Sequence, residues 1–202
     1  QVVVVTKSGL IKRCELSELI TKRVSAISYA KLDENDKVVS VFTVDNEAQK
    51  IVICSKKGYI NSYLVDQVPL VGKNAKGVIG LKNGDEIASC FALSEGINQI
   101  AIATQTQIKR IDLSIIPVGN RTNLGKPINS FLLNSTNGVL KAIPLFANTV
   151  IVKVDVNGNK EYLTVGSLTY LSYDQRINSV GNDIADCNIW ISTIKDSDKA
   201  NE

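Results

Sequence analysis

The sequence predicts an all-β fold of the propeller type, a disc of about four blades with four strands each. Three observations carry this prediction. A pattern of strand, glycine turn and strand recurs every 48 to 50 residues, its strands are β-branched runs, and helical periodicity is weak along the chain. With 202 residues, of which 44% are hydrophobic, the chain can bury a sizeable core.

The repeat is visible in four stretches, VVVVTKSGLIKR (2–13), IVICSKKGYINS (51–62), IAIATQTQIKR (100–110) and, more loosely, VIVKVDVNGNKEYL (150–163). A shift of 49 residues places Ile11 on Ile60, and a shift of 48 places Ile60 on Ile108 and Gly77 on Gly125. We therefore expect one domain, 1–192, made of repeats near 2–49, 50–98, 99–147 and 148–192, followed by a flexible acidic tail, 193–202.

Each repeat is expected to begin with a hairpin. A β-branched run such as 2–5 forms the first strand, and a polar turn leads into a short second strand. Gly9, Gly58 and Gly158 occupy this turn, where glycine can adopt a positive φ at no steric cost. Residues 15–22 (ELSELITK) form at most one or two helical turns.

The rest of each repeat is expected to supply two more strands. The third lies near 27–32 in the first repeat and 78–82 in the second. Tight turns, DENDK (33–37) and NGDE (83–86), precede the last strand. A single blade cannot bury both of its faces, so neighbouring repeats must stack, and equivalent loops then recur around a rim.

Composition excludes several classes of function. The chain has no histidine, which removes the commonest general base and metal ligand, so we expect a non-catalytic chain without metal or cofactor. No apolar run reaches the roughly 18 residues of a membrane span, and no signal-peptide pattern is visible. The four cysteines form no CxxC pair, which indicates a reduced, cytoplasmic protein. The absence of methionine and the start at Gln1 indicate a fragment.

Charge is distributed unevenly along the chain. Residues 50–82 contain six lysines and one acid, whereas residues 183–202 contain five acids and two lysines. A basic body indicates a polyanionic partner, and a solvated lysine-rich surface is the alternative.

Three stretches, TKSGLIKR, SKKGYINSYLVDQVP and VGKNAKGVIGLKNGDEI, resemble the C-terminal domain of bacterial type IIA topoisomerase A subunits, the family of gyrase and topoisomerase IV. The resemblance covers residues 2 to about 192 and implies an open β-pinwheel that binds and bends duplex DNA and presents it for strand passage. It also implies that the catalytic residues lie elsewhere, in the ATPase B subunit and the rest of the A subunit, and we expect this fragment to be monomeric.

Within this family, gyrase carries a seven-residue box of one Gln, three basic residues and three glycines. The nearest stretch here, VGKNAKG (71–77), keeps Lys73, Lys76 and Gly77 but lacks the Gln, the basic pair and the double glycine. NRTNLGK (120–126) departs further. These departures favour the topoisomerase IV branch over the gyrase branch, which wraps DNA strongly. A propeller-like module that binds proteins rather than nucleic acid is the remaining alternative.

Lysine offers a phosphate a point charge and arginine a planar fork. Adjacent strand residues point to opposite faces, so only one member of each Lys-Arg pair can serve a given face. Cations near the ends of strands or in loops are the candidate DNA contacts: Lys12, Arg13, Lys56, Lys57, Lys73, Lys76, Lys82, Lys109, Arg110, Arg121, Lys126 and Arg176. The alternative for the strand pairs is that they deter pairing at a sheet edge.

Overall fold

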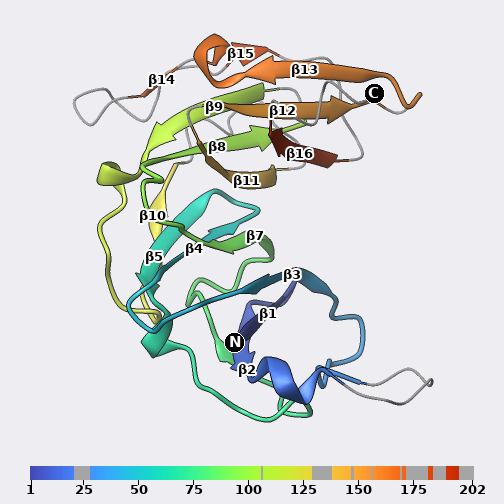
Figure 1. The fold of residues 1–202 in the computed structure, drawn as a ribbon, viewed down its shortest axis with the longest axis vertical. Helices are drawn as coiled ribbons and strands as arrows, with labels where there is room; N and C mark the ends of the chain where they lie inside the picture. Colours follow the sequence, from blue (N-terminus) through green and yellow to red (C-terminus); the bar gives the residue numbers. More distant parts are fainter. Residues whose placement is uncertain are drawn as a thin grey trace. The chain divides into compact units, whose positions relative to one another are not determined.

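The fold was analysed in a computed structural model, which describes residues 1–20, 28–105, 107–128, 138–146, 148–155, 157–168, 170–171, 182–183 and 190–195 (Figure 1). The structure is all-β, as the sequence predicts, with several small sheets, and within these residues the helices are short 3-10 turns. The chain forms two compact units, one of residues 1–55, 60–94 and 118–126, and one of 56–59, 95–117 and 127–202. The predicted single domain over 1–192 stays a prediction.

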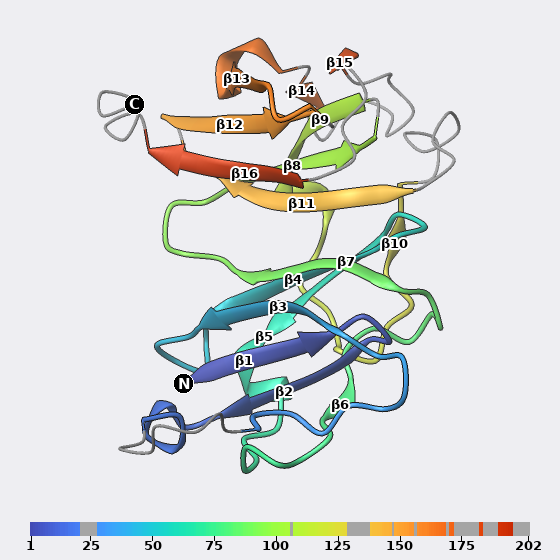
Figure 2. The same ribbon diagram turned by 90° about the vertical axis from the view of Figure 1, so that its right-hand side faces the viewer.

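The first unit contains two four-stranded sheets (Figure 2). The first sheet has the order β3-β1-β2-β6, with strands β1 (Val2–Thr6), β2 (Leu10–Cys14), β3 (Val38–Thr43) and β6 (Val78–Ile79). The second has the order β10-β5-β4-β7, with strands β4 (Lys50–Ser55), β5 (Tyr59–Leu64), β7 (Ile87–Ala92) and β10 (Lys126–Pro127). In both sheets the first strand of a repeat is central and buried.

The second unit contains the other two sheets. One has the order β11-β8-β9-β14, with β15 also paired to β9, and is made of β8 (Gln99–Thr104), β9 (Gln107–Asp112), β11 (Val139–Leu145), β14 (Tyr170–Leu171) and β15 (Asn182–Asp183). The other has the order β13-β12-β16, with β12 (Thr149–Val154), β13 (Lys160–Thr164) and β16 (Trp190–Lys195). Strand β16 therefore includes the start of the predicted tail, whose remainder, 196–202, lies outside the described residues.

The hairpin prediction is confirmed. Gly9, Gly58 and Gly158 have φ of +92°, +80° and +87°. A 3-10 helix follows the second strand of every repeat, at Leu16–Glu18, Val65–Gln67, Leu113–Ile115 and Val165–Ser167. The turns at 33–37 and 83–86 lead directly into β3 and β7.

The origin of the outermost strand differs from the prediction. Residues 28–32 form no strand, and residue 27 lies outside the described residues. The edge of β2 is instead paired with β6, which belongs to the second repeat, and β5 is paired with β10, from the third. Likewise β14, from the fourth repeat, pairs with β9. Each of these sheets is thus completed by the repeat that follows it.

Glycine makes this exchange possible where the incoming strand approaches. Gly77 has a φ of +92°, and a Cβ there would lie 2.9 Å from the carbonyl oxygen of Ile11. Its equivalent, Gly125, has a φ of +83°, and a Cβ there would lie 3.1 Å from the carbonyl oxygen of Ile60. A side chain at either position would meet backbone, which cannot move aside.

Backbone hydrogen bonds recur at the same points of successive repeats. The amide of Gly80 donates to Gly9 O at 2.7 Å, and that of Ile128 donates to Gly58 O at 2.8 Å. The hairpin turn of each of these repeats therefore bonds to the following repeat, so the hairpin and the next loop are fixed relative to one another.

The cysteines in the described part of the chain behave as core residues. Cys14, Cys54 and Cys90 are buried and carry no disulfide. Burial raises the pKa of Cys54 to about 12, so the thiol stays protonated and unreactive at neutral pH. Cys187 lies outside the described residues.

The Gly77→Ala variant tests the exchanged strand. The substitution adds left-handed strain of about 1 kcal/mol and a clash with Ile11, so we expect it to lower the free energy of unfolding by about 2 to 3 kcal/mol in urea denaturation. Gly84→Ala is the matched control, because Gly84 also has a positive φ, +68°, but nothing lies within 4 Å of its added Cβ. Equal destabilisation of the two variants would contradict the close approach.

Candidate nucleic-acid interface

Two of the predicted phosphate contacts in the first unit are buried. Lys12 is 2% exposed and Arg13 is 5% exposed, and backbone carbonyls of residues 68–73 lie against the ends of their side chains. Lys12 Nζ donates to the carbonyl oxygen of Gly72 at 3.3 Å and also to that of Lys73. The ammonium group therefore binds the loop of the next repeat and does not face solvent.

Arg13 has a similar role on the other face of β2. Its Nε donates to Val68 O at 2.6 Å, its Nη1 donates to Gln1 Oε1 at 2.9 Å, and its Nη2 forms an ion pair with Glu47 at 2.7 Å. These contacts occupy the planar fork with partners inside the unit. Lys12 and Arg13 thus join the first repeat to residues 68–73 of the second.

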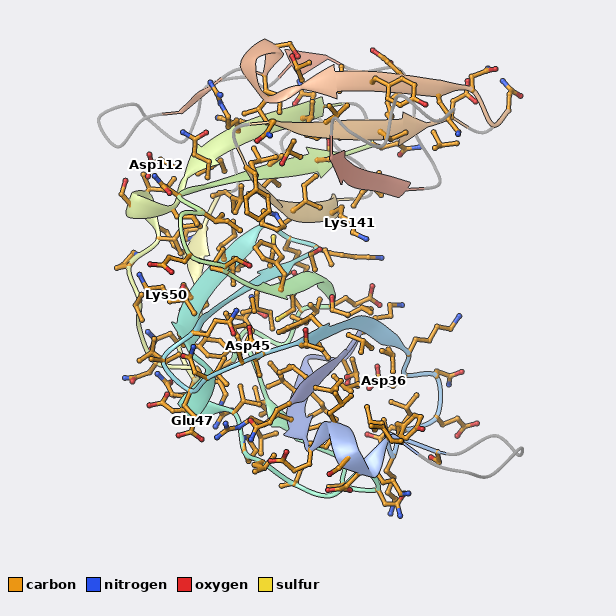
Figure 3. All side chains as sticks on the ribbon, viewed as in Figure 1. Asp36, Asp45, Glu47, Lys50, Asp112 and Lys141 are labelled. Carbon is orange, nitrogen blue, oxygen red and sulfur yellow. The ribbon has the colours of Figure 1, made fainter. Side chains whose placement is uncertain are left out.

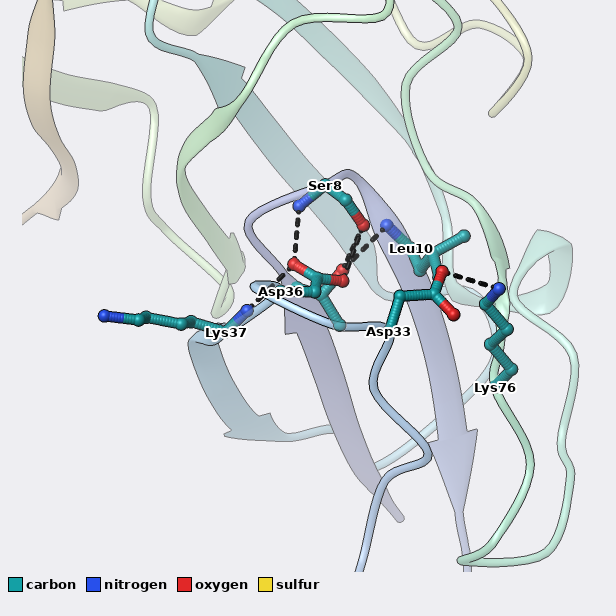
Figure 4. Close-up of polar contacts among 7 residues, drawn as sticks. Ser8, Leu10, Asp33, Asp36, Lys37 and Lys76 are labelled. Atoms are coloured by element: carbon teal, nitrogen blue, oxygen red, sulfur yellow. Dashed lines mark hydrogen bonds and ion pairs between the residues drawn. The ribbon is translucent and has the colours of Figure 1, made fainter.

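The loop that corresponds to the gyrase box, residues 71–77, is accessible. Lys76 is exposed, and its Nζ forms an ion pair with Asp33 at 2.6 Å (Figure 4). Lys73 is half-buried, and its backbone amide donates to Glu18 Oε2 at 2.9 Å. Lys82, beyond β6, is exposed.

The equivalent loop of the third repeat, residues 119–125, lies against the second repeat within the same unit. Arg121 is half-buried, and its Nε donates to Gln67 O at 2.9 Å while its Nη1 donates to Ile79 O. The amide of Lys82 donates to Asn123 O at 3.3 Å. These bonds place Arg121 and Lys82 in adjacent segments of the first unit. We call Lys73, Lys76, Lys82, Arg121 and the exposed Lys126 the loop cations.

In the second unit, Lys56 and Lys57 are exposed in a hairpin turn and Arg110 is half-buried. Lys109 is fully buried, and this burial lowers the pKa of its ammonium group to about 8. Arg176 lies outside the described residues.

The exposed side chains of both units, such as Lys50 in the first and Lys141 in the second, point away from the sheets (Figure 3).

A well-bonded carboxylate of the first unit, Asp36, has a structural role. Asp36 accepts hydrogen bonds from Ser8 N at 2.9 Å and Ser8 Oγ at 2.6 Å (Figure 4). Partial burial raises the pKa of Asp36, but the bonds from Ser8, Thr6 and Lys37 outweigh it and lower the pKa overall. Asp36 thereby ties the 33–37 turn to the first hairpin.

Two further features are absent from the part of the chain that the structure describes. It contains no cluster of three or more Cys, Asp or Glu side chains that could hold a metal ion. It also contains no helix long and apolar enough to cross a bilayer.

The sequence analysis did not identify Glu18 and Gln67, whose side chains accept hydrogen bonds from the loop amides of Lys73 and Arg121. The 49-residue shift places Glu18 on Gln67.

Comparisons with known proteins agree on one family. A family model described as "DNA gyrase C-terminal domain, beta-propeller" matches residues 1–45 and 49–94. The A subunit of DNA topoisomerase 4 from Streptococcus pyogenes is 31% identical over 186 residues, which cover 85% of this chain and 22% of the relative. The chain thus spans about a fifth of the length of that relative.

Solved structures show the same fold. The C-terminal domain of DNA topoisomerase IV superposes with a TM-score of 0.78 at 22% identity, covering 96% of this chain and 61% of that one. The C-terminal domain of DNA gyrase A superposes with a TM-score of 0.77 at 21% identity, covering 95% and 63%. The sheets completed by the following repeat are therefore those of a β-pinwheel, a propeller-like domain. The chain belongs to the family of C-terminal domains of type IIA topoisomerase A subunits.

Lys109 is expected to titrate well below the other lysines. Because its folded pKa of about 8 lies below the ordinary value of 10.5, the unfolded chain binds more protons between these pH values. The contribution of Lys109 to the unfolding free energy should therefore rise with pH through that window, by at most about 3 kcal/mol. NMR of labelled lysine side chains measures the pKa, and Lys109→Met should abolish the rise while Lys141→Met, at an exposed site, leaves it. A normal lysine pKa at Lys109 would contradict this.

Proposed function

We propose that this chain is the DNA-binding C-terminal domain of a topoisomerase IV A subunit, and that it binds and bends duplex DNA on its loop cations. The observation that carries the proposal is the repetition of a cation at equivalent loop positions, since the 48-residue shift places Lys73 on Arg121. The parent protein is then a bacterial, cytoplasmic, ATP-dependent type II topoisomerase. Its catalytic residues belong to the B subunit and to the rest of the A subunit.

The electrostatics of the loops support a polyanionic ligand. Residues 113–154 contain no Asp or Glu, so the third-repeat loop carries Arg121 and Lys126 without a nearby acid in sequence. Lys76 is paired with Asp33, but both side chains are about half exposed, and an exposed ion pair contributes little. A phosphate can therefore replace Asp33 at small cost.

The proposed DNA-binding surface includes fewer cations than the sequence analysis suggests. Lys12, Arg13 and Lys109 are buried, so we leave them out of it. Lys56, Lys57 and Arg110 remain proposed contacts of the second unit, and Arg176 stays a prediction. Phosphate contacts position a protein on DNA without reading bases, so binding should tolerate any duplex sequence.

Salt dependence tests the proposal. Counterion release gives a log–log slope of about −0.9 per neutralised phosphate, so four to five contacts predict a slope of about −4. The K73A/K76A variant should reduce the magnitude of this slope by about 2 and weaken all duplexes alike. Fluorescence anisotropy on a labelled duplex of about thirty base pairs measures both effects.

The K37A/K50A variant is the matched control, because it removes the same number of lysines, both of them exposed. Figure 4 shows Lys37 pointing away from Lys76. A slope near zero for the wild type would favour a protein-interaction module instead. Equal effects of the two double variants would remove the 71–77 loop from the DNA-binding surface.

The gyrase counterpart is the second candidate, because the gyrase A domain superposes almost as well. The incomplete box at 71–77 favours topoisomerase IV. Relaxing closed circular DNA in the presence of this chain separates the two. We expect little trapped positive writhe from a domain that bends DNA, whereas marked positive writhe would assign the chain to gyrase.

A further inference from the structure

Two neighbouring loops of the first unit are held by equivalent side chains. Lys12 Nζ donates to the carbonyl oxygen of Gly72 at 3.3 Å. Forty-nine residues on, Asn61 takes the place of Lys12, and its Nδ2 donates to Asn120 O at 2.8 Å. The 48-residue shift places Gly72 on Asn120, so both loops have the same carbonyl held from the second strand of the preceding repeat.

The next residue of each loop is held by its amide. Lys73 N donates to Glu18 Oε2 at 2.9 Å, and Arg121 N donates to Gln67 Oε1 at 2.7 Å. Glu18 and Gln67 are the last residues of equivalent 3-10 helices. Each loop is therefore fixed at adjacent positions by one side-chain donor and one side-chain acceptor, and the amide so fixed belongs to a loop cation.

The charges of these side chains change together between the repeats. The first loop is held by a cation and an anion, Lys12 and Glu18, and the second by two neutral amides, Asn61 and Gln67. Burial lowers the pKa of Lys12, whereas the electrostatic influence of Cys14 and of the Glu18 carboxylate opposes this shift. A buried ammonium without a counter-charge is costly, so the lysine and the glutamate belong together. The formal charges of the two side chains sum to zero in each pair.

We propose that Lys12 with Glu18, and Asn61 with Gln67, are interchangeable anchoring pairs that position Lys73 and Arg121 toward DNA phosphate without touching the DNA themselves. This inference rests on the proposed function for its ligand. It makes Lys12 a positioning residue, in contrast to the phosphate contact that the sequence suggests. Preorganisation lowers the entropic cost of ordering the loops when they bind.

The K12N/E18Q variant tests the proposal by giving the first loop the pair that holds the second. We expect this variant to bind a thirty-base-pair duplex within about twofold of the wild type, with the same salt slope. The amide hydrogen exchange of Lys73 should stay as slow as in the wild type. The single variant Lys12→Met removes the donor but leaves the carboxylate of Glu18, so it should bind about five- to tenfold more weakly and exchange the Lys73 amide faster. The double variant thus restores what the single variant loses.

Several outcomes would overturn the proposal. A salt slope reduced by about 1 in K12N/E18Q would mean that Lys12 contacts a phosphate itself. Wild-type affinity and exchange in Lys12→Met would show that the anchor positions nothing. If Lys12→Met does not fold, the K12N/E18A variant replaces it, because it removes the acceptor of the Lys73 amide without leaving a buried lysine beside the lost carboxylate. Wild-type affinity and exchange in K12N/E18A would then overturn the proposal.

The same measurements separate the inference from the proposed function. Absence of salt-dependent DNA binding by the wild type would remove the proposed function and, with it, the ligand of the anchored loops. DNA binding with a slope near −4, together with a Lys12→Met variant that behaves as the wild type, would remove the anchoring alone. Slow exchange at Lys73 in both the wild type and K12N/E18Q, with fast exchange in Lys12→Met, supports it.

Discussion

The pairing of each hairpin with backbone from the next repeat is the interaction on which the rest of the structure depends. A hairpin alone leaves the outer edge of its second strand unpaired, and an unpaired edge costs hydrogen bonds and invites aggregation. Here β6 satisfies the edge of β2 and β10 satisfies that of β5. The loop between the two repeats must then cross the sheet edge closely, which requires glycine at Gly77 and Gly125. The positions of the basic loops at 71–77 and 119–125 follow from this exchange.

The exchange also explains why cations at the ends of strands are not surface groups. Once β2 is paired on both sides, the side chains of Lys12 and Arg13 lie under the incoming loop, and they donate to carbonyl oxygens of the second repeat. Lys109 on β9, a strand that is paired with β14, is also fully buried. Charge that reaches solvent is carried by the loops themselves. The buried cations Lys12 and Arg13 therefore hold the loop in place, whereas the loop cations lie nearer the solvent.

The sequence predicts the parts of the fold that depend on neighbouring residues and on the repeat. The strand–turn–strand hairpins, the glycines with positive φ and the turns before β3 and β7 follow from local conformational preference. Local preference does not predict which repeat supplies the outer strand of each sheet, because Val78 and Ile79 have the same β-propensity whichever hairpin they join. Burial of Lys12 was missed for a related reason, since alternation along a strand shows which residues share a face but not what covers it. The role of Glu18 and Gln67 had one signal in the sequence, namely that they occupy equivalent positions 49 residues apart. That equivalence can be interpreted only with the hydrogen bonds that these side chains accept from the loop amides.

The three hairpins show how much variation the exchanged architecture tolerates beneath a loop. The first repeat uses a charged pair, Lys12 and Glu18, and the second uses a neutral pair, Asn61 and Gln67. In the third repeat the equivalent positions hold Lys109 and Ile115, a lysine without the acid. Burial lowers the pKa of Lys109 to about 8. This direction is consistent with the sequence, because isoleucine supplies no negative charge that would favour the protonated amine. The charge of Glu18 thus opposes the lowering of the Lys12 pKa by burial, whereas the third repeat has an uncharged residue, Ile115, at the equivalent position. Because Lys12 and Lys109 are both buried, the charge that a polyanion meets is set by the loop cations.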